Sequence, residues 1–142
     1  MVSPAPGAVV LVGFPFSDLS QTKLRPAVVR ADGGRGDWIL CQVTSRPYGD
    51  ARTIKLENTD FAAGSLHITS FAPRGKLFTA SRDLIVAQVG KLKAEAFRRI
   101  IDSNVTLYLA CRRLFLRSSG TSSEYVDLGH DFSETSVHPG TA

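Results

Sequence analysis

Two short stretches of this 142-residue chain contain the side-chain types that bind an anionic phosphodiester and stabilise its reaction. Arg25 begins one extended stretch, directly after the polar residues 17–24, and Thr44 with Ser45 ends another. Arginine presents a planar fork of donors that matches two phosphoryl oxygens, and hydroxyl groups can donate to a third. Fixed donors of this kind also stabilise the charge that develops when such a phosphorus atom is attacked.

A series of short strands and one helix must position these residues. Stretches of β-branched and aromatic residues, separated by turn residues, predict strands at 8–16, 25–30, 38–45, 52–56, 66–70, 76–79 and 85–89. Apolar residues at spacings of three and four predict a helix from Lys93 to about Leu116, and its continuity across Asp102-Ser103-Asn104 stays open. This order predicts a mainly β (α+β) fold, a small barrel with a C-terminal helix. In an antiparallel barrel, Arg25 and Thr44 would meet at one rim.

The charge is unevenly distributed along the chain. The formal net charge is +4, and the pI is about 9.4. Residues 117–142 have a net charge of −3, so residues 1–116 have a net charge of +7. We expect a folded basic domain over 1–116 and a mobile, acidic, Ser/Thr/Gly-rich tail over 117–142. The tail has two alternative interpretations, an inert extension or a segment that folds back on a basic groove.

Several classes of protein are not expected. No apolar run approaches the roughly 20 residues that span a bilayer, and the N-terminal residues lack the features of a signal peptide, so we expect a cytoplasmic protein. Cys41 and Cys111 lie among apolar residues, as reduced cysteines do. His67, His130 and His138 have no ligand-like spacing with them. We therefore expect no metal site and no cofactor.

The order and spacing of several short blocks resemble the MazF/PemK family of toxins. The first blocks are Gly7 to Phe16, Lys23-Leu24-Arg25-Pro26-Ala27-Val28-Val29 and Cys41-Gln42-Val43-Thr44-Ser45. The later blocks are Gly64-Ser65-Leu66, Ser70, Lys76-Leu77-Phe78-Thr79 and Gly90-Lys91-Leu92. The resemblance extends from about Gly7 to about Leu116. It implies an SH3-like small β-barrel with a terminal helix, the MazF/CcdB-like fold, and a homodimer.

The resemblance also implies an activity, a sequence-specific and ribosome-independent endoribonuclease that cuts single-stranded RNA without metal. The 2′-hydroxyl next to the scissile bond attacks the phosphorus. The family's catalytic arginine and threonine correspond to Arg25 and Thr44, and Ser45 is placed to assist. Some members have a glutamate before the arginine, where this chain has Leu24. Asp18 is then the nearest carboxylate that could act as base, provided that its loop folds inward.

Other residues of these blocks are candidates for RNA contact, and the family implies a protein partner. The candidates are Phe16, Lys23, Arg46, Tyr48, Arg52 and Arg74. The implied partner is a cognate antitoxin. Any contact with DNA would be made only through that antitoxin. Two alternatives stay open, a gyrase poison like the CcdB toxins, which share the barrel, and a non-catalytic SH3-like module that binds RNA or peptide.

Overall fold

The computed structural model describes residues 4–15, 22–47, 49 and 52–119 of the chain. These residues form eight strands, two 3₁₀ turns and one α-helix. The chain divides into two units, Met1–Leu107 and Tyr108–Ala142.

The first unit contains all the strands, and every paired strand is antiparallel to its neighbours. A six-stranded sheet has the order β5 (Phe61–Gly64), β8 (Ile85–Leu92), β1 (Ala8–Pro15), β2 (Thr22–Gly34), β3 (Asp37–Gln42) and β7 (Leu77–Ser81). A second sheet pairs β4 (Ile54–Leu56) with β6 (Ser70–Ala72). The 3₁₀ turns η1 (Asn58–Asp60) and η2 (Arg82–Leu84) precede β5 and β8.

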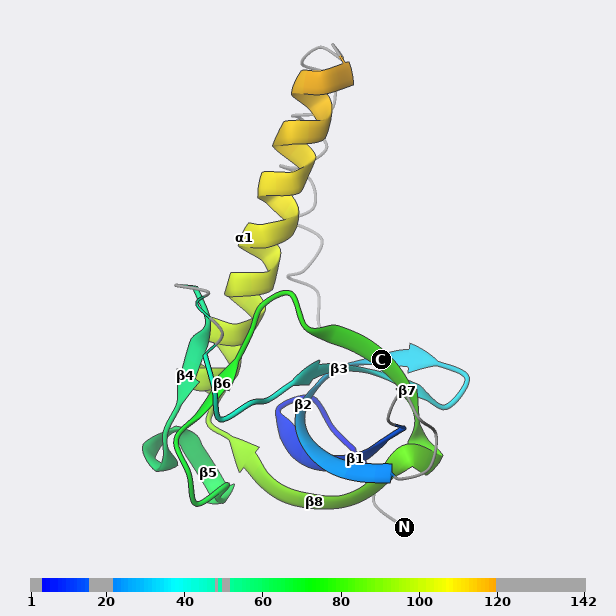
Figure 1. Cartoon of the computed structure of the whole chain (residues 1–142), viewed down its shortest axis with the longest axis vertical. Helices are drawn as coiled ribbons and strands as arrows, with labels where there is room; N and C mark the ends of the chain where they lie inside the picture. The colour runs from blue at the N-terminus through cyan, green and yellow to red at the C-terminus, as the bar shows by residue number, and fades with distance from the viewer. Residues whose placement is uncertain (1–3, 16–21, 48, 50–51, 120–142) are drawn as a thin grey trace, which may run out of the picture. The chain divides into compact units, whose positions relative to one another are not determined.

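The predicted fold class is confirmed: the chain is mostly antiparallel strand with one C-terminal helix. The strands curve around one another, with β8 passing beneath β1 and β2 in Figure 1. The sheet is not closed by hydrogen bonds in the part of the chain that the structure describes, because β5 and β7 lie at opposite edges of the six-stranded sheet and pair with one neighbour each.

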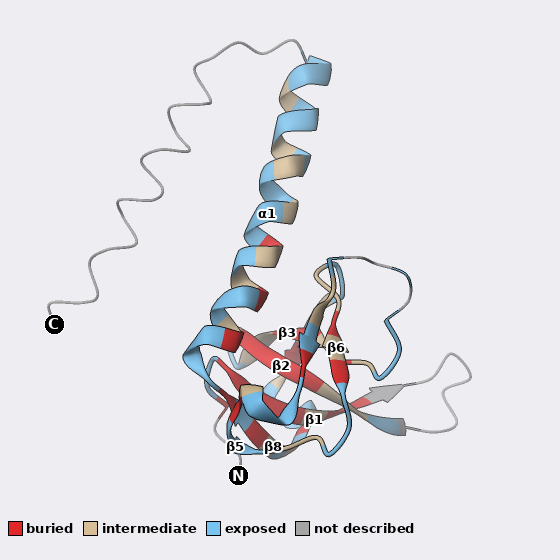
Figure 2. Cartoon of the chain, turned by 90° about the vertical axis from the view of Figure 1, so that its left-hand side faces the viewer, coloured by how far each residue is buried: buried red, intermediate tan, exposed pale blue. Residues whose placement is uncertain are grey.

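Strand β1 is buried on both faces because its sequence is apolar at nearly every position. Val9 packs on one face with Val28, Cys41 and Val43, in a cluster that also includes Leu56 and Ala72 from the second sheet. On the other face, the second cluster consists of Ala8, Val10, Val12, Ala27, Val29, Leu40, Ala80 and Ile85. Figure 2 shows this burial along the strands. A strand with a continuous apolar run is expected to lie inside a sheet with both faces covered.

The helix α1 (Ala94–Ser119) begins directly after β8, and its first turns complete the core of the first unit. Ala96 and Ile100 are buried in the cluster around Val9. The polar residues that left its continuity open do not interrupt it. The Ser103 hydroxyl donates to the Arg52 carbonyl at 3.5 Å, and the Asn104 side-chain amide donates to the Arg74 carbonyl. These side chains therefore attach the helix to two loops.

The second unit, as far as it is described, is the helical segment Tyr108–Ser119. Its apolar side chains Tyr108, Leu109, Leu114 and Phe115 are exposed. The proposed acidic tail lies outside the described residues from position 120 onward. Among the described residues, no helix is both long enough and apolar enough to cross a membrane.

The predicted strand at 66–70 is wrong. Residues 65–69 form a loop, and β6 begins only at Ser70. The Ser65 hydroxyl accepts a hydrogen bond from the His67 backbone N–H at 2.9 Å, and the φ angle of His67 is +59°. That backbone conformation is incompatible with a strand. The same region contains a strand that the sequence did not predict, β5, which Gly64 ends.

Candidate functional site

Thr44 lies where the two sheets join. It forms an isolated antiparallel bridge with Phe71 of β6. The Thr44 N–H donates to the Phe71 carbonyl at 2.9 Å, and the Phe71 N–H donates to the Thr44 carbonyl at 2.7 Å. Because both residues use both backbone groups, the conformation of Thr44 is fixed from the second sheet as well as from β3.

Arg25 lies two residues before Ala27 on β2, and Thr44 lies two residues after Gln42, the partner of Ala27 on β3. The pairing of β2 with β3 matches Ala27 with Gln42, and the Val43 N–H continues it by donating to the Pro26 carbonyl at 3.0 Å. The next position of this antiparallel register matches Arg25 with Thr44. Residues directly opposite each other have their Cβ atoms about 5 Å apart and their side chains on one face. The meeting of Arg25 and Thr44 stays a prediction, which an extension of this register supports.

These two side chains lie on the face that turns away from the helix-side core. Val28 and Val43 are both buried in the cluster that includes Ala96 and Ile100 of α1. Successive side chains of a strand alternate between faces. Thr44 follows Val43, and Arg25 is an odd number of residues from Val28, so both side chains project to the other face. Both residues are half-buried.

The cross-strand row that contains Arg25 and Thr44 continues into the second sheet. It adds two residues that the sequence did not predict as site residues. Phe71 is the partner of Thr44 on one side and of Lys55 on the other. Their strand neighbours Leu56 and Ala72 are buried in the helix-side core, so Phe71 and Lys55 point away from it. Arg25, Thr44, Phe71 and Lys55 thus form one row across four neighbouring segments. Phe71 is half-buried and Lys55 is exposed.

The residues after Thr44 leave the strand in a tight turn. The Arg46 backbone N–H donates to the Thr44 Oγ1 at 3.2 Å. A hydroxyl that accepts this bond still has its own proton to donate. Ser45 and Arg46 are exposed at this turn, and Lys23, two residues before Arg25 on β2, is exposed on the same face as Arg25. Arg46 therefore adjoins Thr44 through this bond, and Lys23 adds a second cationic side chain to the face of Arg25.

Two other predicted RNA contacts lie elsewhere in the first unit. The backbone carbonyls of Arg52 and Arg74 accept hydrogen bonds from Ser103 and Asn104 of α1. The backbones of these two arginines are therefore attached to the helix. Phe16, Asp18 and Tyr48 lie outside the described residues.

One buried thiol lies on the helix-side face of β3. The Cys41 Sγ is 3.4 Å from the Pro73 carbonyl oxygen. Burial raises the pKa of the Cys41 thiol, and the nearby Arg30 guanidinium opposes that shift in part. This residue belongs to the core and takes no part in the row described above. Among the described residues there is no group of three or more His, Cys, Asp or Glu side chains placed to bind a metal ion.

Solved structures with the same fold are toxins and toxin–antitoxin complexes. MazF (Form-I) from Deinococcus radiodurans has a TM-score of 0.59 and 21% identity over 76% of this chain and 98% of its own. The MazE–MazF complex (Form-III) from the same organism has a TM-score of 0.60 and 20% identity, covering 74% of this chain and 95% of that one.

A third solved structure has lower sequence identity and similar coverage. An endoribonuclease in complex with its cognate antitoxin, from a Mycobacterial species, has a TM-score of 0.58 and 13% identity, over 75% of this chain and 93% of that chain. No protein-family profile and no curated protein sequence matches the chain. The resemblance stated from the sequence blocks is confirmed in the fold.

Proposed function

We propose that this chain, which has the fold of the MazF toxins, is a sequence-specific endoribonuclease that acts as the toxin of a toxin–antitoxin pair. The observation that supports it most is the register of β2 with β3, which continues through the bond from the Val43 N–H to the Pro26 carbonyl. One further step of this register would place Arg25 opposite Thr44, on a face that also has Lys23 and Lys55. A guanidinium and a hydroxyl about 5 Å apart at their Cβ atoms can contact one phosphate between them.

The proposed reaction is a transesterification within the RNA strand. The 2′-oxygen bonds to the adjacent phosphorus, the bond from phosphorus to the 5′-oxygen breaks, and the products are a 2′,3′-cyclic phosphate and a 5′-hydroxyl. The proton of the 2′-hydroxyl passes to a base, and the leaving 5′-oxygen gains a proton. No water is consumed in this step. Much of the acceleration would come from holding the 2′-oxygen in line with the leaving oxygen.

Arg25 and Thr44 have different roles in this proposal. Arg25 stabilises the charge that develops on the phosphoryl oxygens, because its pKa is too high for efficient proton transfer. Thr44 positions the phosphate through the hydroxyl proton that its bond from Arg46 leaves available. Ser45, exposed beside it, assists with a second hydroxyl. Asp18 is the proposed base, since Leu24 cannot fill that role.

The RNA strand would follow the cross-strand row. Lys23, Arg46 and Lys55 neutralise phosphates on either side of the scissile bond, and Phe71 offers an apolar contact between Thr44 and Lys55. Phe16 and Tyr48 are proposed to stack on bases. Arg52 and Arg74, which lie around the helix, contribute longer-range attraction for the strand.

The partners of the proposed toxin follow from its structural neighbours. MazE–MazF and a mycobacterial endoribonuclease bound to its antitoxin suggest a cognate antitoxin for this chain. We further propose that the chain acts in the cytoplasm as a homodimer, without a metal or other cofactor, and contacts DNA only through the antitoxin.

The test is to incubate the purified chain with one long unstructured RNA and to map every new end with its chemistry. The proposal expects cuts at a short recurring sequence, each with a 5′-hydroxyl and a cyclic phosphate. Covalent gyrase–DNA complexes without RNA cleavage would instead identify a gyrase poison. RNA or peptide binding without new ends would identify a non-catalytic module.

A further inference from the structure

A polar hollow of about 410 Å³ lies in the first unit, beyond the Lys55 end of the row. Its lining comes from two loops that flank the second sheet, and consists of Glu57, Asn58, Thr59, His67, Ile68 and Thr69. This volume lies within the range of small-ligand sites, roughly 300 to 1,000 Å³. The lining combines a carboxylate, an amide, two hydroxyls, an imidazole and one exposed aliphatic side chain. Such groups suit a planar polar ligand.

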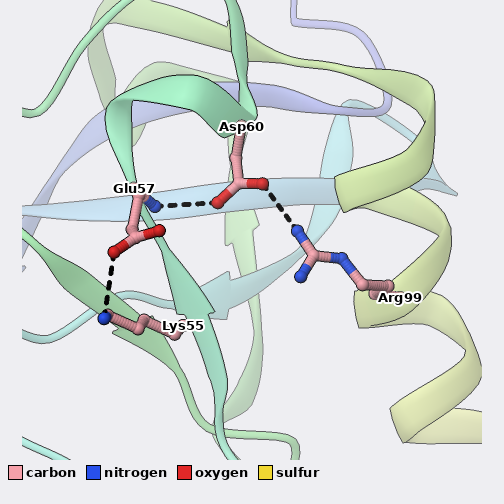
Figure 3. Close-up of polar contacts among 4 residues, drawn as sticks. All are labelled: Lys55, Glu57, Asp60 and Arg99. Atoms are coloured by element: carbon pink, nitrogen blue, oxygen red, sulfur yellow. Dashed lines mark hydrogen bonds and ion pairs between the residues drawn. The ribbon is translucent and has the colours of Figure 1, made fainter.

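The hollow is on the same face as Arg25 and Thr44. The Lys55 Nζ is 2.9 Å from the Glu57 Oε1, so both side chains project to one side of their segment (Figure 3). The pairing of β4 with β6 ends at Leu56 and Ser70, and Glu57 and Thr69 are the residues that adjoin this last pair. The segment that contains Phe71 is the first neighbour of Thr44, and the segment that contains Lys55 is the second. At the usual strand spacing, the second neighbour is about 10 Å away. A nucleotide near the scissile phosphate could therefore reach the hollow.

The first wall of the hollow is anchored before any ligand binds. The Glu57 N–H donates to the Asp60 Oδ2 at 2.8 Å, which closes the turn η1 around Asn58 and Thr59. Asp60 is in turn paired with Arg99 of α1, where an Nη2 to Oδ1 distance of 2.6 Å joins them (Figure 3). The Lys93 N–H also donates to the Asp60 carbonyl at 2.8 Å. The turn is thus fixed to the helix, and Glu57 is fixed with it.

The second wall is attached to the first. The Ser65 hydroxyl donates to the Asn58 Oδ1 at 2.6 Å and accepts from the His67 N–H at 2.9 Å. This arrangement directs the Asn58 amino group, a donor, away from Ser65. His67 has a φ angle of +59°, in the left-handed region that non-glycine residues seldom adopt.

We infer that the hollow binds one nucleobase of the RNA and selects bases that have an exocyclic amino group, adenine, cytosine or guanine, over uracil. The Glu57 carboxylate accepts from the base amino group, as acidic side chains do from the cytosine amino group. The Asn58 amino group donates to a ring nitrogen or carbonyl of the same base. Ile68, exposed beside them, supplies an apolar contact for the ring. Because Glu57 is negatively charged, the hollow disfavours a phosphate.

This inference rests on the proposed function, and the test separates the two. Non-cleavable 2′-O-methyl oligonucleotides that differ in one base measure base discrimination by binding, while mapped cuts on a long RNA measure cleavage. We expect the wild-type chain to disfavour uracil by about tenfold at one position near the cut. Glu57→Gln should abolish that preference and leave the other positions unchanged. Asn58→Asp, which keeps the acceptor for Ser65 but replaces the donor with a second acceptor, should weaken it.

Two control variants isolate the hollow from the rest of the surface. Glu95→Gln removes the same charge from an exposed position on α1 and should leave every preference unchanged. Lys23→Ala, which removes a proposed phosphate contact outside the lining of the hollow, should weaken all oligonucleotides alike. Cleavage with unaltered base preferences in Glu57→Gln would overturn the inference and leave the proposed function standing. Base-dependent binding without any RNA cleavage would support the inference and refute the proposed function. If the wild-type chain shows neither base-dependent binding nor cleavage, both the inference and the proposed function are refuted.

Discussion

Thr44 and Phe71 exchange both of their backbone hydrogen bonds, at 2.9 and 2.7 Å, and this bridge joins the six-stranded sheet to the two-stranded one. The hydroxyl proposed to position the scissile phosphate is therefore fixed from two sheets at once. The Thr44–Phe71 bridge also places Phe71 and Lys55 in the row that begins at Arg25. A site built on paired strands can hold its groups more rigidly than one built on loops.

Replacing Arg25 by alanine is expected to abolish RNA cleavage while the chain stays folded. The substitution removes the charge stabilisation proposed for the phosphoryl oxygens, so kcat should fall by about 100-fold or more. The side chain is half-buried and outside both core clusters, so the free energy of unfolding should change by about 1 kcal/mol or less. Cleavage kinetics and urea unfolding on the same preparation measure both quantities.

The matched control for Arg25 is Arg98→Ala, which removes the same charge from an exposed position on α1. Its kcat should equal that of the wild-type chain. Full activity in Arg25→Ala would refute the assignment, and an equal loss in both variants would show that the total charge of the domain matters more than the position of the guanidinium.

A second prediction concerns the Thr44 hydroxyl. Thr44→Val keeps the shape of the side chain and removes its donor, so kcat should fall about tenfold or more. It also removes the acceptor of the Arg46 N–H, which should lower the free energy of unfolding by about 1 kcal/mol. Thr44→Ser retains the hydroxyl and should stay close to the wild-type rate. Equal rates for the valine and serine variants would contradict a role for the hydroxyl.

The salt dependence of RNA binding tests the extension of the site into the second sheet. If Lys55 neutralises one phosphate, Lys55→Ala should reduce the slope of log affinity against log salt by about 0.7, the value for one contact on a single strand. Binding of a non-cleavable RNA over a range of salt concentrations measures this slope. Arg98→Ala serves again as the control, and an unchanged slope in Lys55→Ala would remove Lys55 from the strand path.

The two cysteines should differ in reactivity in the native chain. Burial raises the pKa of the Cys41 thiol, so little of the reactive thiolate forms near neutral pH, whereas Cys111 is exposed. A thiol reagent should modify Cys111 rapidly and Cys41 slowly. Cys111→Ser should therefore remove the rapid phase. Since the unfolded thiol ionises near pH 8.5, the free energy of unfolding should decrease as pH rises above that value. Rapid modification of Cys41 would contradict its burial.

The sequence predicts the elements whose residues determine their structure locally. The apolar run of β1 and the helical spacing around Ile100 needed no distant partner to be recognised. In contrast, β5 contains Ala62, Ala63 and Gly64, which have little preference for strands. The segment 66–70 has strand-forming residues, but the hydrogen bond from the His67 N–H to the Ser65 hydroxyl and the φ angle of His67 make it a loop.

The same distinction applies to the site. Arg25 and Thr44 were identified because each lies in a recognisable block and because neighbouring strands usually pair. Lys55 and Phe71 were missed, since their place beside Thr44 depends on the pairing of β4 with β6 and on the Thr44–Phe71 bridge. Neither pairing joins strands that are adjacent in the chain, and no local pattern indicates which segments will meet.

The most direct test of the account is the dependence of cleavage on a single 2′-hydroxyl. After the cut sites are mapped, the purified chain is given the same RNA with one 2′-deoxy nucleotide immediately 5′ of a cut, in the presence of EDTA. The account predicts that the unmodified RNA is cut, leaving a 5′-hydroxyl, and that the deoxy bond stays intact while other sites are cut normally. Cleavage at the deoxy position, or loss of all cleavage in EDTA that a divalent ion restores, would contradict it.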